Sequence, residues 1–228
     1  MATNAPRCLG LIGGLGPLAT ILYYREILAA HAARGQTARM LIAHADNKQA
    51  LALVTAKDYD GLAGYLADLI KATAAGGAEL AAIVAVTPYI CAPQLVRLSP
   101  LPLIDIVTEV AAHVRAQGLK RVAMFGTRFT VESKMFGRLD GIDVAMPKPD
   151  EIDLIHAAYM SIVNERDTAE QILRLRALAQ VLIKRDGVEA VLLAGTDLST
   201  AFDKANTDFP AIDCARVHVD AIVRQLCA

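Results

Sequence analysis

The two halves of the chain repeat one order of segments, and this internal duplication constrains the fold more than any other feature. Each half opens with an apolar segment that runs into glycine, "LIGGLGP" in the first and "AMFGTRFT" in the second. Each then has a long helical segment, an apolar segment ending in threonine ("IVAVTP" and "LLAGTD") and a proline-led segment ending near aspartate ("LPLIDIV" and "FPAIDCA"). A repeat of roughly 110 residues predicts two similar α/β lobes that face each other across a ligand cleft.

The short apolar segments are apolar throughout rather than alternating, which is typical of parallel strands covered on both faces. The segments predicted as strands are 8–14, 38–46, 80–87 and 101–107 in the first half, and 120–127, 142–147, 189–196 and 209–214 in the second. Helices are predicted over 17–35, 59–77 and 168–187. We therefore expect two pseudo-symmetric lobes, each a mostly parallel sheet flanked by helices: lobe 1 over 1–106 with a C-terminal helix over 215–228, and lobe 2 over 107–214.

Composition narrows the class of protein. The chain has 228 residues, of which 54% are hydrophobic, and 23 basic against 24 acidic residues. This balance argues against a nucleic-acid partner, which requires a basic excess. No apolar run reaches the roughly 18 residues of a membrane span, and the first residues do not resemble a signal peptide. The 4 cysteines form no CxxC pair, so we predict that the protein binds neither zinc nor another metal. The same cysteines predict a location in the reducing cytoplasm.

Three segments resemble a known family. "IGGLGPLATILYYREI", "FGTRFTVESKMF" and "PAIDCARVH" occur in the order found in the aspartate/glutamate racemase superfamily, and the first of them resembles the opening of aspartate racemases. The resemblance covers nearly the whole chain. It implies the two-lobed fold and an isomerase that uses no PLP or other cofactor and acts on a small carboxylate or amino acid. Because members are often dimers, it also implies a homodimer.

The chain departs from this family at both catalytic positions. The first catalytic segment of the family is usually Cys-Asn-Thr-x-His, whereas this chain has Ala85-Val86-Thr87-Pro88-Tyr89. The second is usually Gly-Cys-Thr-Glu, whereas this chain has Ala194-Gly195-Thr196-Asp197. Thiols suit the transfer of an α-proton because their pKa, ~8.5, can be tuned toward the working pH. Since alanine and glycine cannot carry a proton, the two-thiol mechanism is excluded.

Side chains near these positions could replace the thiols, and each also has a structural interpretation. Asp197 could act as a base or cap the following helix. Tyr89 stands where the family often has histidine, but it could simply be a packed aromatic residue. Cys91 follows Thr87 by about one helical turn and could be a small core residue. The hydroxyls of Thr87 and Thr196 are weak bases unless a neighbour activates them, so we expect them mainly to hydrogen-bond a ligand carboxylate.

Other residues are candidates for holding the substrate. The backbone N–H groups of Gly14, Leu15 and Gly16 come at the start of a helix and could bind an anion, or the glycines could simply form a tight turn. Asp46 ends a predicted strand and could contact an amino or hydroxyl group. Four residues after the 120–127 strand could bind a carboxylate or simply begin a helix: Thr127, Arg128, Thr130 and Ser133.

Two functions from different classes follow. The first is a cofactor-independent isomerase of the amino-acid racemase type that uses acid–base groups other than thiols, or a related lyase or tautomerase that needs one such group. The second is an inactive relative that binds a small carboxylate. Fold alone does not choose between them, because the reacting groups have changed.

Overall fold

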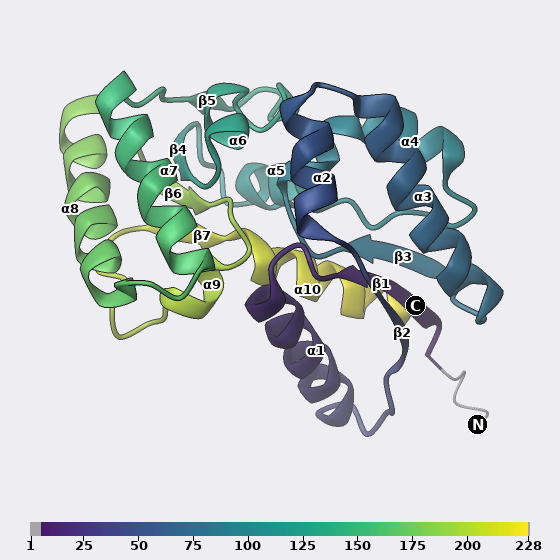
Figure 1. Ribbon diagram of the computed structural model, residues 1–228. Helices are drawn as coiled ribbons and strands as arrows, with labels where there is room; N and C mark the ends of the chain where they lie inside the picture. The colour runs from purple at the N-terminus through teal and green to yellow at the C-terminus, as the bar shows by residue number, and fades with distance from the viewer. Residues whose placement is uncertain (1–5, 228) are drawn as a thin grey trace. The chain divides into compact units, whose positions relative to one another are not determined.

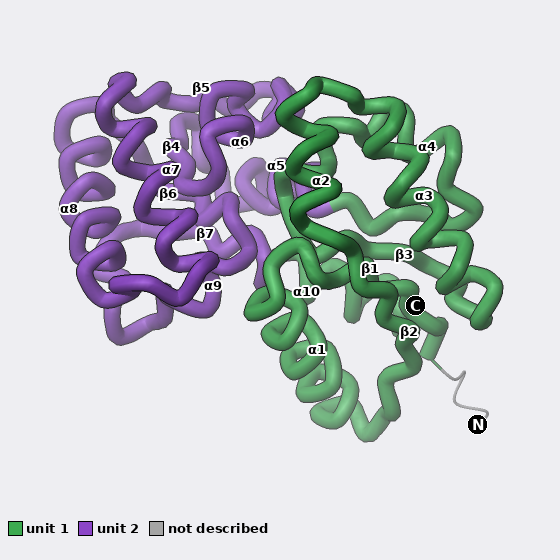
Figure 2. Tube along the Cα trace, viewed as in Figure 1, with its two compact units in different colours: residues 1–105, 218–228 green, residues 106–217 purple. Residues whose placement is uncertain are grey.

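The computed structural model describes residues 6–227. The chain divides into two compact units: unit 1 is Met1–Asp105 with His218–Ala228, and unit 2 is Ile106–Val217 (Figure 2). Each unit contains one parallel sheet with helices packed around it (Figure 1). The predicted α/β architecture of two parallel sheets flanked by helices is therefore confirmed. Within residues 6–227, no helix combines the length and apolar character needed to cross a membrane.

Unit 1 is built on a three-stranded sheet in the order β2-β1-β3. Its strands are β1 (Cys8–Gly13), β2 (Arg39–His44) and β3 (Leu80–Ile83). The central strand β1 is buried along its whole length. Burying an aliphatic side chain contributes about 1.5–3 kcal/mol, so β1 anchors the unit. The helical elements are α1 (Pro17–Ala32), α2 (Asn47–Thr55), α3 (Tyr59–Ala75), the 3-10 turn η1 (Thr87–Cys91), α4 (Ala92–Leu98) and, from His218 onward, α10 (Cys214–Leu226).

Unit 2 is built on a four-stranded sheet in the order β5-β4-β6-β7. Its strands are β4 (Arg121–Phe125), β5 (Asp143–Val144), β6 (Ala190–Leu193) and β7 (Ala211–Asp213). Strands β4 and β6 lie in the middle of the sheet and are almost completely buried. The helices are α5 (Ile106–Ala116), α6 (Arg128–Glu132), α7 (Pro149–Val163), α8 (Thr168–Asp186) and α9 (Leu198–Ala201).

The two sheets share one topology. The first strand of each unit, β1 or β4, lies between the second and third strands of that unit. In unit 2, β7 then pairs with β6. In unit 1, Leu103 forms a single parallel bridge to Ala81 of β3, in the place that corresponds to β7. The repeat in the sequence is therefore a repeat of strand order.

Three secondary-structure predictions need correction. The strand expected over 101–107 is reduced to the bridge at Leu103, because the apolar residues from Ile106 onward recur with helical spacing and form the buried face of α5. Strand β2 is not covered on both faces, because it lies at the sheet edge, and each of its residues is exposed or half-buried. Helices α2, α5 and α7 are absent from the sequence prediction.

A buried histidine fastens α10 to the rest of unit 1. The imidazole of His218 lies 3.0 Å (Nδ1) from the Tyr23 hydroxyl and 2.8 Å (Nε2) from the Ile104 carbonyl oxygen. Because a carbonyl only accepts, Nε2 carries the proton and the Tyr23 hydroxyl donates to Nδ1. Burial lowers the pKa of His218 to about 4, so the ring is neutral at pH 7.

Candidate active site

The predicted site residues of each unit follow the carboxyl ends of its strands. All strand pairs are parallel, so the carboxyl ends in one sheet lie along one edge. In unit 1 this edge is followed by residues 14–16, Asp46 and η1. In unit 2 it is followed by residues 126–133 and by the turn 194–197. Ligands of open α/β sheets bind outside such edges, so these turns are where chemistry is expected.

Tyr159 of α7 fills the space beside Gly195. A Cβ atom built on Gly195 would lie 2.7 Å from Cζ of Tyr159 and 2.9 Å from its Cδ2. Side chains do not approach a Cβ atom so closely, so any larger residue at 195 would have to displace the ring. The space for the thiol expected from the resemblance is therefore occupied by an aromatic ring from another element.

Asp197 and Tyr159 form a buried pair at this turn. Asp197 is 1% exposed and Tyr159 8% exposed, and the Tyr159 hydroxyl donates to Oδ2 of Asp197 over 3.3 Å. Asp197 stands at the N-cap position of α9, but its side chain makes no capping hydrogen bond. Burial and the neighbouring Asp197 charge raise the pKa of Tyr159 well above its usual range. The phenol therefore keeps its proton at neutral pH and remains a donor to the carboxylate.

The segment after β4 is ordered by its own hydroxyl groups. Thr127 caps α6, since its Oγ1 accepts from the Thr130 N–H over 3.3 Å, and the two hydroxyl oxygens lie 3.0 Å apart. The Ser133 hydroxyl donates to the carbonyl of Phe129 over 2.5 Å. These bonds account for the local turn. Carboxylate binding by Thr127, Thr130 and Ser133 stays a prediction.

Arg128 is held by acidic side chains on two helices. Its guanidinium forms ion pairs with Glu132 of α6 and Asp153 of α7. Hydrogen bonds to Asp153 and Glu132 raise the pKa of Arg128 above its ordinary value. A ligand carboxylate would have to compete with both carboxylates for this cation. Carboxylate binding by Arg128 also stays a prediction.

Helix α7 places a histidine against the same segment. Nδ1 of His156 accepts from the backbone N–H of Arg128 over 3.3 Å, so a neutral ring carries its proton on Nε2. Burial, followed by the charge of Arg128, lowers the pKa of His156. Asp153, His156 and Tyr159 are spaced three residues apart and therefore share one face of α7. This face contacts both turns of unit 2.

His156 and Tyr159 are absent from the residues predicted from the sequence. The resemblance identifies turns at the strand ends and says nothing of α7, which supplies both side chains. A signal was present in "DLIHAAYM", because an acid, an imidazole and a phenol recur there at helical spacing. That pattern becomes informative only once the contact between α7 and the strand ends is known.

Two backbone groups of the glycine turn in unit 1 are already hydrogen-bonded to a side chain of the same unit. Gly14 has φ of +85°, and a Cβ atom there would lie 2.6 Å from the carbonyl oxygen of Ala45. Its N–H donates to the Thr20 hydroxyl over 3.0 Å, and that hydroxyl donates to the Gly16 carbonyl over 3.0 Å. Leu15 is buried. The tight turn is therefore observed, while anion binding by Gly14, Leu15 and Gly16 stays a prediction.

Asp46 caps a helix. Its Oδ1 accepts from the N–H groups of Lys48 over 2.8 Å and Gln49 over 3.3 Å, at the start of α2. The residue is exposed, and its own N–H donates to the Tyr65 hydroxyl over 2.6 Å. A contact to a substrate amino or hydroxyl group would use the remaining carboxylate oxygen and stays a prediction.

Tyr89 is part of the interior of unit 1. The side chain is completely covered. Its hydroxyl donates to the carbonyl of Ile104 over 3.0 Å and accepts from the N–H of Ile83 over 3.2 Å. The phenol therefore joins the end of β3 to the segment beside it, in agreement with the packed-aromatic interpretation.

Cys91 is also completely covered. Its thiol donates to the carbonyl of Pro88 over 3.1 Å, and burial raises its pKa to about 12. The thiol is therefore protonated at neutral pH and is a poor base or nucleophile. Ala85 and Thr87, by contrast, are half-buried at the end of β3, and Thr196 of unit 2 is buried.

The strand ends of the two units thus offer different chemistry. In unit 2, a buried carboxylate, a phenol and a neutral imidazole can accept, hold or return a proton. In unit 1, the Cys91 thiol and the Tyr89 phenol are buried, Thr87 is half-buried, and Asp46 is exposed. Among residues 6–227, no cluster of three or more His, Cys, Asp or Glu side chains is arranged to hold a metal ion.

Comparison with known proteins identifies a family from the sequence and a shared fold from solved structures. A family model described as Asp/Glu/Hydantoin racemase matches residues 12–222. A solved Asp/Glu racemase structure from Yersinia pestis is 23% identical, with a TM-score of 0.85 over 97% of this chain and 100% of that chain. An aspartate racemase homologue from Pyrococcus horikoshii is 21% identical, with a TM-score of 0.82 over 97% of this chain and 100% of that one. An aspartate racemase from Picrophilus torridus is 19% identical, with a TM-score of 0.77 over 96% and 94%. At these identities the structures demonstrate a shared fold.

Proposed function

Because the chain belongs to the Asp/Glu/Hydantoin racemase family, we propose that it is a cofactor-independent isomerase of the amino-acid racemase type, acting on a small carboxylic or amino acid. The acid–base groups that we propose are not the two thiols that are usual in the family that the sequence resembles. The observation that carries the proposal is the buried Tyr159–Asp197 pair, whose ring occupies the space beside Gly195.

The proposed chemistry is proton transfer at the substrate Cα atom. The Asp197 carboxylate takes the α-proton, and the electron pair left on Cα delocalises into the adjacent substrate carboxylate. Tyr159 stays protonated and donates to Asp197, which fixes the orientation of the carboxylate. Return of a proton to Cα completes the exchange. Solvent exclusion at this buried turn strengthens each of these interactions.

Racemisation also needs a group that returns the proton to the opposite face of Cα. A role for Thr87, the half-buried first residue of η1, stays a prediction, since the Tyr89 hydroxyl bonds backbone groups and the Cys91 thiol is buried. A hydroxyl needs activation by a neighbour for this role. Because the Tyr89 hydroxyl and the Cys91 thiol of unit 1 donate to backbone carbonyls, a second candidate function is a tautomerase or lyase step that uses Asp197 as its single acid–base group.

Solvent deuterium exchange tests the proposal. Aspartate, glutamate and small carboxylic acids are incubated with the protein in D2O, and loss of the Cα proton signal is followed by NMR. We expect Asp197→Asn to abolish exchange, because an amide cannot accept the proton. Tyr159→Phe should reduce the rate by a smaller factor, and Cys91→Ser should leave it unchanged.

Asp150→Asn, an exposed change in the first turn of α7, is the matched control and should exchange as the parent does. Exchange that survives in Asp197→Asn would refute the assignment of the base. If no acid exchanges while one raises the melting temperature, the chain is an inactive relative that binds a carboxylate. Ligand at a hundred times its Kd would add about 2.7 kcal/mol of stability.

We also propose that the protein is a cytoplasmic homodimer. All 4 cysteines are free, which suits a reducing compartment, and the resembling family is often dimeric. Light scattering of the purified chain tests the oligomeric state.

A further inference from the structure

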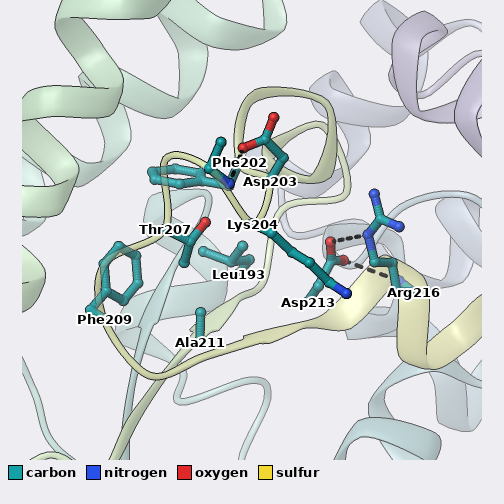
Figure 3. Close-up of a pocket in the computed structure, with 10 residues that line it drawn as sticks. Leu193, Phe202, Asp203, Lys204, Thr207, Phe209, Ala211, Asp213 and Arg216 are labelled. Atoms are coloured by element: carbon teal, nitrogen blue, oxygen red, sulfur yellow. Dashed lines mark hydrogen bonds and ion pairs between the residues drawn. The ribbon is translucent and has the colours of Figure 1, made fainter.

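Unit 2 contains a pocket, and neither Tyr159 nor Asp197 is among the residues that line it. It has a volume of about 720 Å³ and is bounded by β6, β7 and the segment 202–210 that joins α9 to β7 (Figure 3). Pockets of about 300–1,000 Å³ are the usual size for small-molecule sites. The space is therefore large enough for a ligand of the size of an aromatic acid.

One side of the pocket is apolar and preformed. Leu193, Phe202, Phe209 and Ala211 line it. The rings of Phe202 and Phe209 pack edge to face with centroids 5.9 Å apart, and Phe209 packs in the same way on Phe125 at 6.4 Å. Both lining rings are buried by these contacts. Rings fixed in this way give an apolar ligand a surface that need not be ordered on binding.

The acidic groups of the pocket already have donors. The Asp213 carboxylate accepts from the Ser199 hydroxyl over 2.6 Å, and from the backbone N–H and Nε of Arg216 over 3.0 and 3.1 Å. Oδ1 of Asp203 accepts from the N–H groups of Ala205 and Asn206 over 2.8 and 3.0 Å. The Asp213 carboxylate is therefore paired with a cation, whereas Oδ1 of Asp203 is held by backbone donors.

Lys204 is the cation that remains for a ligand. Figure 3 shows its side chain extending along the pocket toward the side where Asp213 and Arg216 pair. Within residues 6–227, its ammonium group makes no hydrogen bond or ion pair. A cation beside an apolar wall suits a ligand that carries a negative charge on an apolar body.

We propose that this pocket binds a small organic acid with an aromatic body. The carboxylate of the acid pairs with Lys204, and its ring packs on the wall formed by Leu193, Phe202 and Phe209. The site is independent of the proposed isomerase chemistry, because none of these side chains belongs to the Tyr159–Asp197 pair.

Three probes separate the two parts of the site. Phenylacetate carries both the ring and the charge, phenylacetamide keeps the ring without the charge, and acetate keeps the charge without the ring. Each is titrated into the full chain while backbone amide NMR signals are followed. We expect phenylacetate to shift the amide signals of Leu193 and Ala211 and to bind about tenfold more tightly than either partial probe, since it alone makes both the apolar and the charged contact.

Two variants test the role of the cation. Lys204→Met should weaken phenylacetate binding about tenfold and leave phenylacetamide binding unchanged. Lys184→Met, an exposed change at the end of α8, is the matched control and should leave both affinities as in the parent. Lys204 is itself exposed, so its replacement does not threaten folding.

The proposal is overturned if phenylacetate fails to shift the pocket signals, if the amide binds as tightly as the acid, or if Lys204→Met and Lys184→Met behave alike. Repeating the titration with Asp197→Asn keeps this result distinct from the isomerase proposal. Phenylacetate binding should persist in that variant even though deuterium exchange is lost.

Discussion

Units 1 and 2 each place a tyrosine and an aspartate near strand ends, but they use them differently. In unit 1, the Tyr89 hydroxyl bonds backbone groups of Ile83 and Ile104, and the Asp46 carboxylate caps α2. In unit 2, the Tyr159 hydroxyl bonds the Asp197 carboxylate, and Asp197 caps nothing. At its strand ends, unit 1 thus uses these two side chains to bond its own backbone, whereas unit 2 pairs them with each other in a buried site.

This difference shows what a duplicated fold preserves. Strand order and parallel pairing recur in both units, since they follow from the apolar pattern of the segments. The polar groups at the strand ends do not recur, because each needs a partner only within its own unit. A buried carboxylate that is not needed for capping is retained at a cost in stability, which makes unit 2 the better location for chemistry.

The largest effect is expected where Tyr159 packs on Gly195. Tyr159→Ala removes a buried ring and should destabilise the protein by about 3–5 kcal/mol, the range for buried aromatic residues. Gly195→Cys should destabilise it by about 1–3 kcal/mol, because the new side chain collides with the ring. Urea unfolding of both variants and of the double variant measures the coupling.

In the double variant, the cysteine enters the space left by the ring, so part of the loss caused by Tyr159→Ala should be recovered. Ala85→Cys, at the corresponding position in unit 1, is the matched control and should have little effect, since Ala85 already carries a Cβ atom and is half-buried. Strictly additive losses in the double variant would contradict the space-filling role of Tyr159.

The next effect concerns pH and the buried His218 of unit 1. Its pKa in the folded protein is about 4, below the ordinary value of 6.5, so the unfolded chain binds more protons between these values. Stability is therefore fully present above pH 6.5 and falls as the pH drops toward 4, by about 3 kcal/mol at roughly 1.4 kcal/mol per pH unit. Urea unfolding across this range measures the slope.

His218→Gln removes the contribution of His218 and should reduce this slope, leaving the contribution of His156, whose pKa is also lowered, whatever the effect on stability at pH 7. His113 on α5, which is half-buried, provides the matched control as His113→Gln and should retain the slope of the parent. An unchanged slope in His218→Gln would show that another group is responsible.

The sequence predicts the framework better than the site, for a physical reason. Apolar runs and the repeat predict both parallel sheets, because burial on two faces leaves a continuous hydrophobic signature. The site depends instead on contacts between distant elements. Tyr159 lies 36 positions before Gly195 in the chain, and only the packing of α7 brings its ring to that turn. The strand predicted over 101–107 is wrong because its apolar residues Ile106 and Val107 belong to the buried face of α5.

A smaller effect is expected for Tyr89 of unit 1. Tyr89→Phe keeps the buried ring but removes the hydroxyl that joins Ile83 to Ile104, and an unsatisfied buried group costs about 1–3 kcal/mol. Tyr24→Phe, on the exposed side of α1, should be neutral. If Tyr89→Phe lowers deuterium exchange far more than stability, the phenol takes part in chemistry and the contrast between the units is wrong.

The smallest effect concerns Asp46, which differs from Asp197 in capping its helix. Asp46→Ala should cost about 0.5–2 kcal/mol, whereas Asp46→Asn should cost little because asparagine caps a helix nearly as well. Asp220→Ala, an exposed change on α10, serves as the control in the same urea titrations. Asparagine keeps the cap but removes the charge, so it separates the two roles. Deuterium exchange that falls in Asp46→Asn while stability holds would assign Asp46 to the substrate as well as to α2.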